Sequence, residues 1–569
     1  MENKILSLDN KPYPAYKSLK QKFLFEQFEF KIDYVQGDPF AAPSKCVIRI
    51  QKNEFPVSVK QHWNQTRRVP LCDFFGRRLA KLISNLPKKD MGSGKSGLIR
   101  IDHGGQQILD RASCQITEQI MQFCFEVGLP AYGRRIAGKH CAYLLCEVLP
   151  RLIRDTLNIP IDEEIKLTQH IHCYLNDLAL REKINEIGAI AFVADGSVLP
   201  RISGDRQEPM PRDFTPFKSP EGLNTKFLLP YEYAGKNEVT GMLLPSGIHI
   251  ITGGGYHGKS TLLQALAQGV YCNIPGDGRE LVITNSHCMQ IKAEEGRAIS
   301  GVDLRPLIQN MPGKRDTSCF NSQDASGSTS QAASIVEAME SGSRLLLMDE
   351  DSCATNLLIR DARMQALVQK QWEPITPWID RIEDFYHQYG LSTVLVIGGC
   401  GDYLEVANQV LKMEEYQLRN VTVEASRIVN EYKNLRKKEE IYPLVPSKDR
   451  YISPETIDAS RGKHSFKLDL IGTKILRFGK HEIDLRSLDQ LTDSSQLRAA
   501  ACAIMWIRSK AEKSDDCLKK IFSDLENELK SEGLKVLWNE QEHPGDLAMP
   551  RIQEISGLLN RLRPLKVFQ

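Results

Sequence analysis

The clearest pattern of hydrophobic positions lies in the middle third of the chain. An isoleucine-rich run at residues 248–251 leads into glycines and predicts a buried strand. Further apolar runs predict strands at 281–284, 344–348 and 391–397. Apolar positions after the glycines repeat on one helical face and predict a helix packed on a sheet: Leu262, Leu263, Leu266, Ala267 and Val270. This part of the chain is therefore expected to form an α/β core.

Weaker periodicity flanks this core on both sides. Residues 23–34 and 44–50 partly alternate apolar and polar positions, as half-buried strands do. Near the C-terminus, residues 466–485 alternate like a small sheet, and 497–529 and 552–562 have the spacing of amphipathic helices. Both flanks are therefore expected to mix strands and helices.

These patterns divide the chain into three expected domains. Four prolines between Pro209 and Pro220 indicate a linker into the core. A helix predicted at 421–440 ends in a run of charges that is typical of a solvated face. We expect an α+β N-terminal region, an α/β core and a small α+β C-terminal domain at residues 1–235, 236–430 and 431–569.

The glycine-rich loop between the first predicted strand and helix carries the clearest chemical signal. Gly253, Gly258, Lys259 and Ser260 match the template G-x-x-x-x-G-K-[ST]. In such a loop the backbone N–H groups form an anion-binding nest, the lysine reaches the outer phosphates and the hydroxyl joins a Mg²⁺ shell. We therefore predict that ATP and Mg²⁺ bind here, with contacts from the whole loop: Gly253, Gly254, Gly255, Tyr256, His257, Gly258, Lys259, Ser260 and Thr261.

A second candidate element of the site ends the strand predicted at 344–348. Asp349 and Glu350 follow this apolar run, so both carboxylates emerge at the C-terminal edge of a buried strand, where ligands bind open α/β sheets. We expect Asp349 to hold the Mg²⁺ and Glu350 to polarise the attacking water. Glu350 and Lys259 are thus the candidate catalytic residues of a nucleotide hydrolase.

A serine- and glycine-rich helix start lies between these two elements. Its N-terminus offers free N–H groups and a positive dipole end to an anion, so Ser326, Gly327, Ser328 and Thr329 are candidate nucleotide contacts. Ser326 stands 23 residues before Asp349. At this spacing the sequence resembles the ABC-class ATPases, whose Leu-Ser-Gly-Gly-Gln signature precedes the acidic strand end.

Three further segments extend the resemblance to ABC-class ATPases. Gln290 is a candidate for the Q-loop glutamine that contacts the metal, with residues 293–297 as the alternative, and residues 351–356 are similar to the D-loop. The strand at 391–397 resembles the one that carries the switch histidine, but the sequence after it reads GGCGD. Either another group, Asp402 or a backbone N–H, steadies the γ-phosphate, or hydrolysis is slow.

Over most of its length the chain resembles one soluble family, the predicted ATPases of the ABC class. The motifs that carry this resemblance are VGLPAYGR, ADGSVLPR, GGGYHGKST, IPGDGRE, ASGSTSQAA, DEDSCATN, EPITPWID and GGCGDY. The family implies a cytosolic, non-transporter ATPase, and ABC proteins sandwich two ATP molecules in a homodimer, with residues 326–329 of one chain facing the phosphate loop of the other. Some relatives are associated with RNA processing, so RNA or DNA is a further candidate partner.

Composition narrows the class of protein further. The 569 residues carry a net charge of +2, from 74 basic and 72 acidic residues, which argues against a uniformly nucleic-acid-coating surface but leaves local basic faces open. The 14 cysteines show no zinc-binding spacing and indicate reduced thiols in the cytoplasm. No run of about eighteen apolar residues occurs, so we expect no membrane-spanning helix and no membrane partner.

Three shorter motifs leave alternatives open. Residues 92–96 (GSGKS) resemble the end of a phosphate loop, but Lys89 stands where the first glycine belongs, so a mobile loop is the default and contact with a phosphate backbone the alternative. The basic turn at 128–135 either grips phosphates or begins a solvated helix. Tyr231 or Tyr233 either is half-buried or offers its ring to an adenine.

The sequence therefore predicts a soluble ABC-class ATPase that binds MgATP at a homodimer interface. Hydrolysis is expected to drive a conformational change, with nucleic acid as a candidate target. One alternative is an ATP-gated RNA- or DNA-binding scaffold with little turnover, which the missing histidine permits. The other is a P-loop kinase, which leaves the Ser-Gly helix start at 326–329 unexplained.

Overall fold

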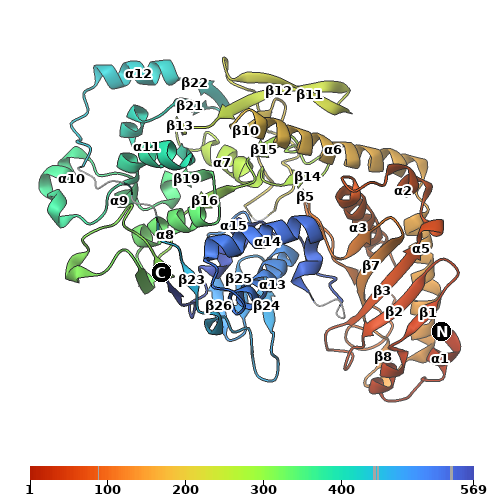
Figure 1. The fold of residues 1–569 in the computed structure, drawn as a ribbon. Helices are drawn as coiled ribbons and strands as arrows, with labels where there is room; N and C mark the ends of the chain where they lie inside the picture. The colour runs from red at the N-terminus through yellow and green to blue at the C-terminus, as the bar shows by residue number, and fades with distance from the viewer. Residues whose placement is uncertain (88, 205, 440–443, 445–446, 539–542) are drawn as a thin grey trace. The chain divides into compact units, whose positions relative to one another are not determined.

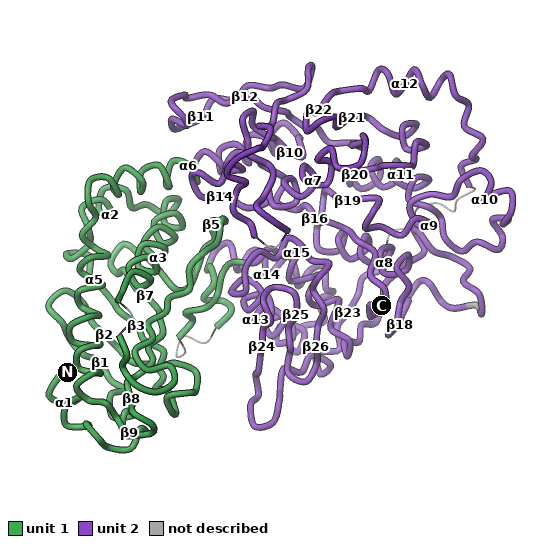
Figure 2. Tube along the Cα trace, turned by 180° about the vertical axis from the view of Figure 1, so that it is seen from behind, with its two compact units in different colours: residues 1–175, 532–549 green, residues 176–531, 550–569 purple. Residues whose placement is uncertain are grey.

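The computed structural model describes residues 1–569 except 88, 205, 440–443, 445–446 and 539–542 (Figure 1). The described chain divides into two compact units, drawn in different colours in Figure 2. Unit 1 comprises residues 1–175 and 532–549, and unit 2 comprises residues 176–531 and 550–569. The first boundary falls within helix α6 (Ile161–Glu186). The domain limits expected at 235 and 430 stay predictions.

Unit 1 is built on an antiparallel sheet of strand order β1-β2-β3-β7-β4, in which β6 also pairs with β7. The strands predicted at 23–34 and 44–50 are confirmed, although residues 25–28 separate the first into β1 and β2. Helix α3 packs against β6 and α5. The strands are Lys22–Leu24 (β1), Glu29–Tyr34 (β2), Ser44–Gln51 (β3), Ile99–Ile101 (β4), Gln107–Ile108 (β5), Cys114–Ile116 (β6), Ile120–Val127 (β7), Ala131–Tyr132 (β8) and Arg135–Ile136 (β9). The helices are Glu2–Leu6 (α1), Val57–His62 (α2), Arg68–Ser84 (α3), Gly138–Ala142 (α4) and Leu149–Leu157 (α5).

The main sheet of unit 2 positions the candidate site. Its order is β16-β19-β20-β13-β21-β22, and all neighbouring strands are parallel except β21 and β22. Val396 of β20 pairs with both Asp349 of β19 and Ile251 of β13, so the acidic strand end and the phosphate loop leave the sheet at the same edge. The strands are Ile248–Gly253 (β13), Cys288–Ile291 (β16), Leu345–Asp349 (β19), Ser392–Val396 (β20), Gln409–Glu414 (β21) and Gln417–Asn420 (β22).

Helices pack on this sheet, and a second, antiparallel sheet completes the core of unit 2. Helices α7 and α11 contact β13 and β20, while α8 contacts β16 and α15. The second sheet has the order β11-β12-β10-β15. Its strands are Ala189–Ala194 (β10), Asn224–Tyr233 (β11), Lys236–Pro245 (β12) and Val282–Thr284 (β15). The remaining core elements are Lys259–Gln268 (α7), Cys272–Asn273 (β14), Arg297–Val302 (β17), Phe320–Ala325 (β18), Gly327–Glu340 (α8), Thr355–Leu358 (α9), Ala362–Leu367 (α10), Trp378–Tyr389 (α11) and Thr422–Glu431 (α12).

The C-terminal part of unit 2 has the predicted strands and helices. The sheet expected at 466–485 is a three-stranded antiparallel meander of order β24-β25-β26. The amphipathic pattern at 497–529 forms two helices, α13 and α14, and 552–562 forms α15. The elements are Tyr451–Ile452 (β23), Leu468–Ile471 (β24), Ile475–Phe478 (β25), His481–Asp484 (β26), Ser494–Ala511 (α13), Leu518–Glu532 (α14), Ile552–Leu559 (α15) and Val567–Phe568 (β27).

The proline-rich passage at 209–220 is an anchored loop, so its prediction as a linker is wrong. Phe217 donates its N–H to Ser197 O at 2.9 Å and accepts from Gly196 N at 2.8 Å. Asp195 accepts from Ser219 N at 2.6 Å. Prolines cannot donate backbone hydrogen bonds, but the residues between them can, and these bonds hold the loop onto unit 2.

The helix predicted at 421–440 is shorter than its charge pattern indicates. Helix α12 ends at Glu431, and Arg436 beyond it is only 6% exposed at its side chain, with Nη2 2.5 Å from Asp380 Oδ1. This buried ion pair favours a chain path that leaves the helix, so the expectation of a solvated charged face is wrong at Arg436. Glu440, the end of the predicted helix, lies outside the described residues.

Candidate nucleotide-binding site

The phosphate loop connects the end of β13 at Gly253 to the start of α7 at Lys259. Gly253 has a φ of +133°, and a Cβ there would lie 2.1 Å from the carbonyl oxygen of Met413. Gly258, the N-cap of α7, has a φ of +99°. Both positions therefore require glycine. The loop ends at a helix N-terminus, whose free N–H groups and dipole favour a phosphate.

The two predicted Mg²⁺ ligands from the loop and the acidic strand lie together. Ser260 Oγ donates a hydrogen bond to Asp349 Oδ2 at 2.8 Å. Lys259 Nζ donates to the carbonyls of Gly253 and Gly254 at 2.7 and 2.8 Å, which holds the ammonium over the loop. A hydroxyl and a carboxylate are the hard oxygen ligands that Mg²⁺ prefers. The described residues contain no group of three His, Cys, Asp or Glu side chains that could hold a metal, so phosphate and water oxygens would complete this shell.

Glu350 is held by backbone N–H groups from the loop after β20. Its Oε2 accepts from Gly398 N at 2.6 Å and Gly399 N at 3.0 Å, and Cys400 Sγ lies 3.0 Å from Oε1. Partial burial alone would raise the pKa of Glu350, but these N–H groups outweigh it and bring the pKa below its usual range. Burial and the contact with Glu350 raise the pKa of the Cys400 thiol to about 12, which keeps the thiol protonated. Glu350 is therefore a fixed, ionised carboxylate beside Asp349.

The remaining loop residues differ in their surroundings. Gly254, Gly255 and Tyr256 are exposed, and Tyr256 is fully so at 101%, with a φ of +64°. His257 Nδ1 accepts from the backbone N–H of Glu415 at 2.7 Å, so the ring is tied to the turn between β21 and β22. The predicted nucleotide contacts of Tyr256, His257 and Thr261 stay predictions.

The Ser-Gly helix start is confirmed as the N-terminus of α8, with Ser326 as its N-cap. Ser326 Oγ lies 3.0 Å from Thr329 Oγ1, while Ser328 and Thr329 are only 8% and 7% exposed. Gly327 N–H donates to Glu295 Oε1 at 2.8 Å. One of the N–H groups expected to meet a phosphate is thus already paired with a carboxylate.

Gln290 lies inside β16, where it pairs with Leu347 of β19. Its backbone N–H donates to Gln490 Oε1 at 3.0 Å, and its own Oε1 is buried without a hydrogen-bond partner among the described residues. A buried oxygen of this kind is costly to leave unpaired. The metal contact of Gln290 stays a prediction.

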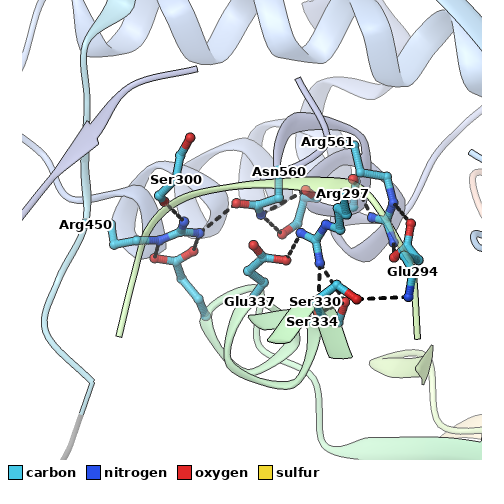
Figure 3. A network of polar contacts seen from close by, with 12 residues as sticks. Glu294, Arg297, Ser300, Ser330, Ser334, Glu337, Arg450, Asn560 and Arg561 are labelled. Atoms are coloured by element: carbon cyan, nitrogen blue, oxygen red, sulfur yellow. Dashed lines mark hydrogen bonds and ion pairs between the residues drawn. The ribbon is translucent and has the colours of Figure 1, made fainter. Parts of the chain in front are cut away.

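The alternative Q-loop segment at 293–297 belongs to a buried polar network (Figure 3). Arg561 holds Glu294 with Nε at 3.0 Å from Oε2, and Arg297 donates to Ser334 Oγ of α8 at 2.7 Å. Arg297 also pairs with Glu337 of α8. These side chains connect α8 to β17 and to the C-terminal end of the chain. The polar groups of Glu294 and Arg297 therefore already have partners within the chain.

Sequence reasoning did not foresee the contacts that three groups make in this site. These are the N–H groups of Gly398 and Gly399, the carboxylate of Glu295 and the turn after β21 that contacts His257. Two adjacent glycines after a buried strand were a usable signal for the first, because such glycines often bind an anion. The other two depend on contacts between distant segments and leave no local pattern.

Comparison with known proteins identifies the family. Residues 163–450 match the P-loop domain of the ABC ATPases, and residues 1–159 match the N-terminal region of ATPases of the ABC class. The chain belongs to the ABC-class ATPases. Residues 467–568 match the C-terminal domain of MRB1590. The predicted fold of this ABC-class protein, a P-loop core with an N-terminal region and a small C-terminal domain, is thus confirmed, and the family is one of nucleotide-binding proteins.

Individual similar proteins give less information about this chain than the family models do. The uncharacterized protein MJ1628 of Methanocaldococcus jannaschii is 29% identical over 283 residues, which are 48% of this chain and 60% of that protein. The chain therefore matches less than two thirds of this relative's length. A metal-chelate type ABC transporter in an inward-facing conformation is 17% identical over 34% of this chain and 78% of its own, with a TM-score of 0.23. A bacterial Atm1-family ABC exporter with ATP bound is 12% identical over 52% of each chain, also at 0.23, so neither structure supports an argument here.

No helix in the described part of this ABC-class chain has the length and apolar character needed to cross a membrane.

Proposed function

We propose that this ABC-class protein binds MgATP at the phosphate loop and hydrolyses it, with a second copy of the chain completing the site. The observation that carries the proposal is the 2.8 Å hydrogen bond between Ser260 and Asp349, with Glu350 next to it in the chain. A metal-binding pair beside a fixed, ionised carboxylate is the arrangement that water activation requires. The cysteines of the described chain are thiols rather than disulfides, which supports a reducing, cytoplasmic setting.

Each polar group at this sheet edge has its own part in the proposed reaction. Lys259 and the N–H groups at the start of α7 bind the phosphates, and Ser260 with Asp349 would hold Mg²⁺. When bound, the Mg²⁺ supplies positive charge for the phosphate oxygens. Glu350 orients the attacking water and accepts its proton. The N–H groups that hold Glu350 come from the loop where the expected histidine is missing, which supports turnover without that histidine.

The start of α8 supports a dimer. Hydrogen bonds of residues 326–329 among the described residues run to Glu295, Ser330 and one another rather than to the phosphate loop. A helix N-terminus stabilises a γ-phosphate only at close range, so in our proposal the loop of a second chain reaches it. Closing on ATP and opening after hydrolysis would then be a ligand-driven population shift.

MgATPase activity measured with and without RNA and DNA, with the oligomeric state followed in the same samples, tests this proposal. Phosphate release without an added acceptor separates a hydrolase from a P-loop kinase. ATP binding without phosphate release under any of these conditions would favour the ATP-gated scaffold instead.

The pKa of Glu350 predicts the acid limb of the reaction. A base whose pKa is lowered stays ionised until the pH falls below that lowered value, so the hydrolysis rate should stay flat between pH 8 and 6. Loss should begin only below the ordinary glutamate value of about 4.3. Steady-state phosphate release at saturating ATP, measured from pH 8 down to below the ordinary glutamate pKa, shows where the hydrolysis rate begins to fall. An acid limb with a midpoint near neutral pH would show that Glu350 is not the titrating base.

A cavity in unit 1 supports nucleic acid as the partner on which the ATPase acts. Its volume is about 580 Å³, and its described lining carries three cationic side chains and no carboxylate: Lys89, Lys95 and Arg151. Lys89 Nζ lies 4.1 Å from the ring centroid of Tyr143, which also lines the cavity. A cationic cavity with an aromatic ring suits a phosphate backbone and an unstacked base. The loop at 92–96 that borders it is followed by strand β4, so it is not a second phosphate loop of the P-loop kind.

Reversing one charge of this cavity should weaken binding of single-stranded RNA. Lys95→Glu is expected to lower the affinity several-fold and to reduce the slope of log affinity against log salt by about 0.7, because one phosphate contact is lost. Fluorescence anisotropy at several salt concentrations measures both. Lys519→Glu, an exposed lysine of α14, is the matched control. Equal effects of the two substitutions would remove the cavity as the interface.

A further inference from the structure

The loop after β20 presents a thiol to the carboxylate of Glu350. Two backbone N–H groups of this loop hold Oε2 of Glu350, and Cys400 Sγ lies 3.0 Å from the other oxygen, Oε1. The two oxygens of one carboxylate are therefore held by different kinds of donor. Cys400 lies in the loop where the resemblance to ABC-class ATPases leads one to expect a histidine.

The Cys400 thiol is the donor in this contact. Burial of the side chain and the negative charge of Glu350 raise the pKa of the thiol to about 12, so the thiol carries its proton at neutral pH. Only a thiolate acts as a nucleophile or a metal ligand, whereas a protonated thiol donates a hydrogen bond to a neighbouring carboxylate. The chemistry open to Cys400 is thus that of a hydrogen-bond donor to Oε1.

Hydrogen bonds to two other elements fix the loop that carries Cys400. Ile397, at its start, donates its N–H to the carbonyl of Ile251 in β13 at 2.9 Å. Tyr403, which is fully buried, donates its hydroxyl to the carbonyl of Leu358 in α9 at 2.8 Å. The backbone N–H of Tyr403 donates to the carbonyl of Cys400 at 3.3 Å. A donor on a loop held at both ends is already in place before a nucleotide binds.

Holding both oxygens of Glu350 fixes the plane of its carboxylate. The last side-chain torsion of a glutamate has broad minima, so a carboxylate that is held at Oε2 alone can turn about its final carbon–carbon bond. A second hydrogen bond at Oε1 removes this freedom. For a base that accepts a proton from water, the direction of the carboxylate lone pairs decides whether the water is aligned for the transfer.

We propose that Cys400 is a positioning residue for hydrolysis, a role that rests on the proposed function of Glu350 as the base. Its thiol donates to Oε1 and sets the orientation in which Glu350 meets the attacking water. Among the described residues, the hydrogen bonds of Cys400 run to Glu350 and Tyr403 and not to the phosphate loop. Removal of the thiol should therefore lower the turnover rate and leave the affinity for MgATP unchanged.

Two substitutions separate the hydrogen bond from packing. Cys400→Ser keeps a donor but is less apolar, and Cys400→Val fills the space without a donor. We expect Cys400→Val to lower kcat about tenfold with the KM for ATP unchanged, and Cys400→Ser to keep kcat within about threefold of the unaltered chain. Steady-state phosphate release against ATP concentration measures both constants. Cys517→Val, at a partly exposed cysteine directly before α14, is the matched control.

A double variant shows whether Cys400 acts through Glu350. Added to Glu350→Gln, Cys400→Val should cause no further loss of the single-turnover rate, because the carboxylate that the thiol orients is already gone. The S–H stretching band of Cys400 is identified in the infrared spectrum by its absence from Cys400→Val. This band should shift when Glu350→Gln replaces the charged acceptor, and its measurement needs no turnover.

The outcomes distinguish failure of this inference from failure of the proposed function. Full activity of Cys400→Val with a loss in Cys400→Ser would show a packing role and overturn the inference. A further loss on adding Cys400→Val to Glu350→Gln, or an S–H band that does not respond to Glu350→Gln, would also overturn it. A chain that binds ATP and shows the expected band shift but releases no phosphate would instead refute the proposed hydrolysis, and with it the role of Cys400 in turnover.

Discussion

Glu350→Gln should abolish ATP hydrolysis while leaving ATP bound. Removing a positioned general base typically costs about 10²- to 10⁴-fold in rate, and glutamine keeps the size of the side chain and one carbonyl oxygen for the N–H groups of Gly398 and Gly399. Ser260 and Asp349 are unchanged, so affinity for MgATP should be preserved. Single-turnover phosphate release and equilibrium binding of ATP measure the two effects separately.

The same variant also tests the proposed dimer. With hydrolysis blocked, the ATP-bound closed state should accumulate, so light scattering should show a dimer in MgATP and a monomer without nucleotide. Glu405→Gln, an exposed glutamate outside the site, is the control and should hydrolyse ATP normally. A Glu350→Gln protein that stays monomeric with bound MgATP and hydrolyses it at the normal rate would contradict both the catalytic role and the composite site.

The sequence predicted the parts of the site that local rules control. The strand, loop and helix around Gly253 and Lys259 follow from hydrophobic periodicity and from the conformations that only glycine adopts. Asp349 could be placed at the same edge because parallel strands end together. The start of α8 was predicted from the serine- and glycine-rich segment at 326–329 and the end of β19 from an apolar run that stops at two acidic residues, and the structure has both there.

Contacts between segments distant in the sequence determine the features that the sequence did not predict. Arg436 reads as a solvated residue in a charged run, yet a buried Asp380 draws it inward and ends α12 early. The prolines before β11 are typical of a linker, but hydrogen bonds from Phe217 and Ser219 anchor the loop to residues 195–197, directly after β10. The turn between β21 and β22 carries no recognisable motif, because its contact with the phosphate loop, from Glu415 N–H to His257, joins residues that are 158 positions apart in the chain.

The loop after β20, where the resemblance leads one to expect the switch histidine, holds Glu350 through backbone N–H groups instead. Any residue type except proline has a backbone N–H group, so the sequence at Gly398 and Gly399 indicates a flexible backbone but not which group the N–H groups bind. Here they bind the carboxylate of Glu350 directly, and if Glu350 is the base, as we propose, a base that is already oriented and ionised needs less help from a neighbouring side chain. This favours turnover over the scaffold alternative, and phosphate release by the unaltered chain compared with Glu350→Gln distinguishes the two.

Arg297→Met should destabilise unit 2 more than any surface substitution. The side chains of Arg297 and its partner Glu337 are only 3% and 5% exposed, and Arg297 also donates to Ser334 Oγ at 2.7 Å. Methionine leaves the Glu337 carboxylate buried without its counter-charge, which typically costs about 3–5 kcal/mol. Hydrogen exchange of peptides from α8 along a urea series measures the loss where it arises.

Two further variants isolate the buried charge as the cause of this loss. Arg477→Met removes one partner of an exposed pair, with side chains 53% and 55% exposed, and should cost at most about 1 kcal/mol. The double variant Arg297→Met, Glu337→Leu removes both buried charges and should regain most of the stability, since no uncompensated carboxylate remains. Because Glu337 lies on the helix that begins at Ser326, the same loss should loosen the helix start that our proposal presents to the second chain's nucleotide. Equal costs for Arg297→Met and Arg477→Met would show that the network in Figure 3 does not hold α8 in place.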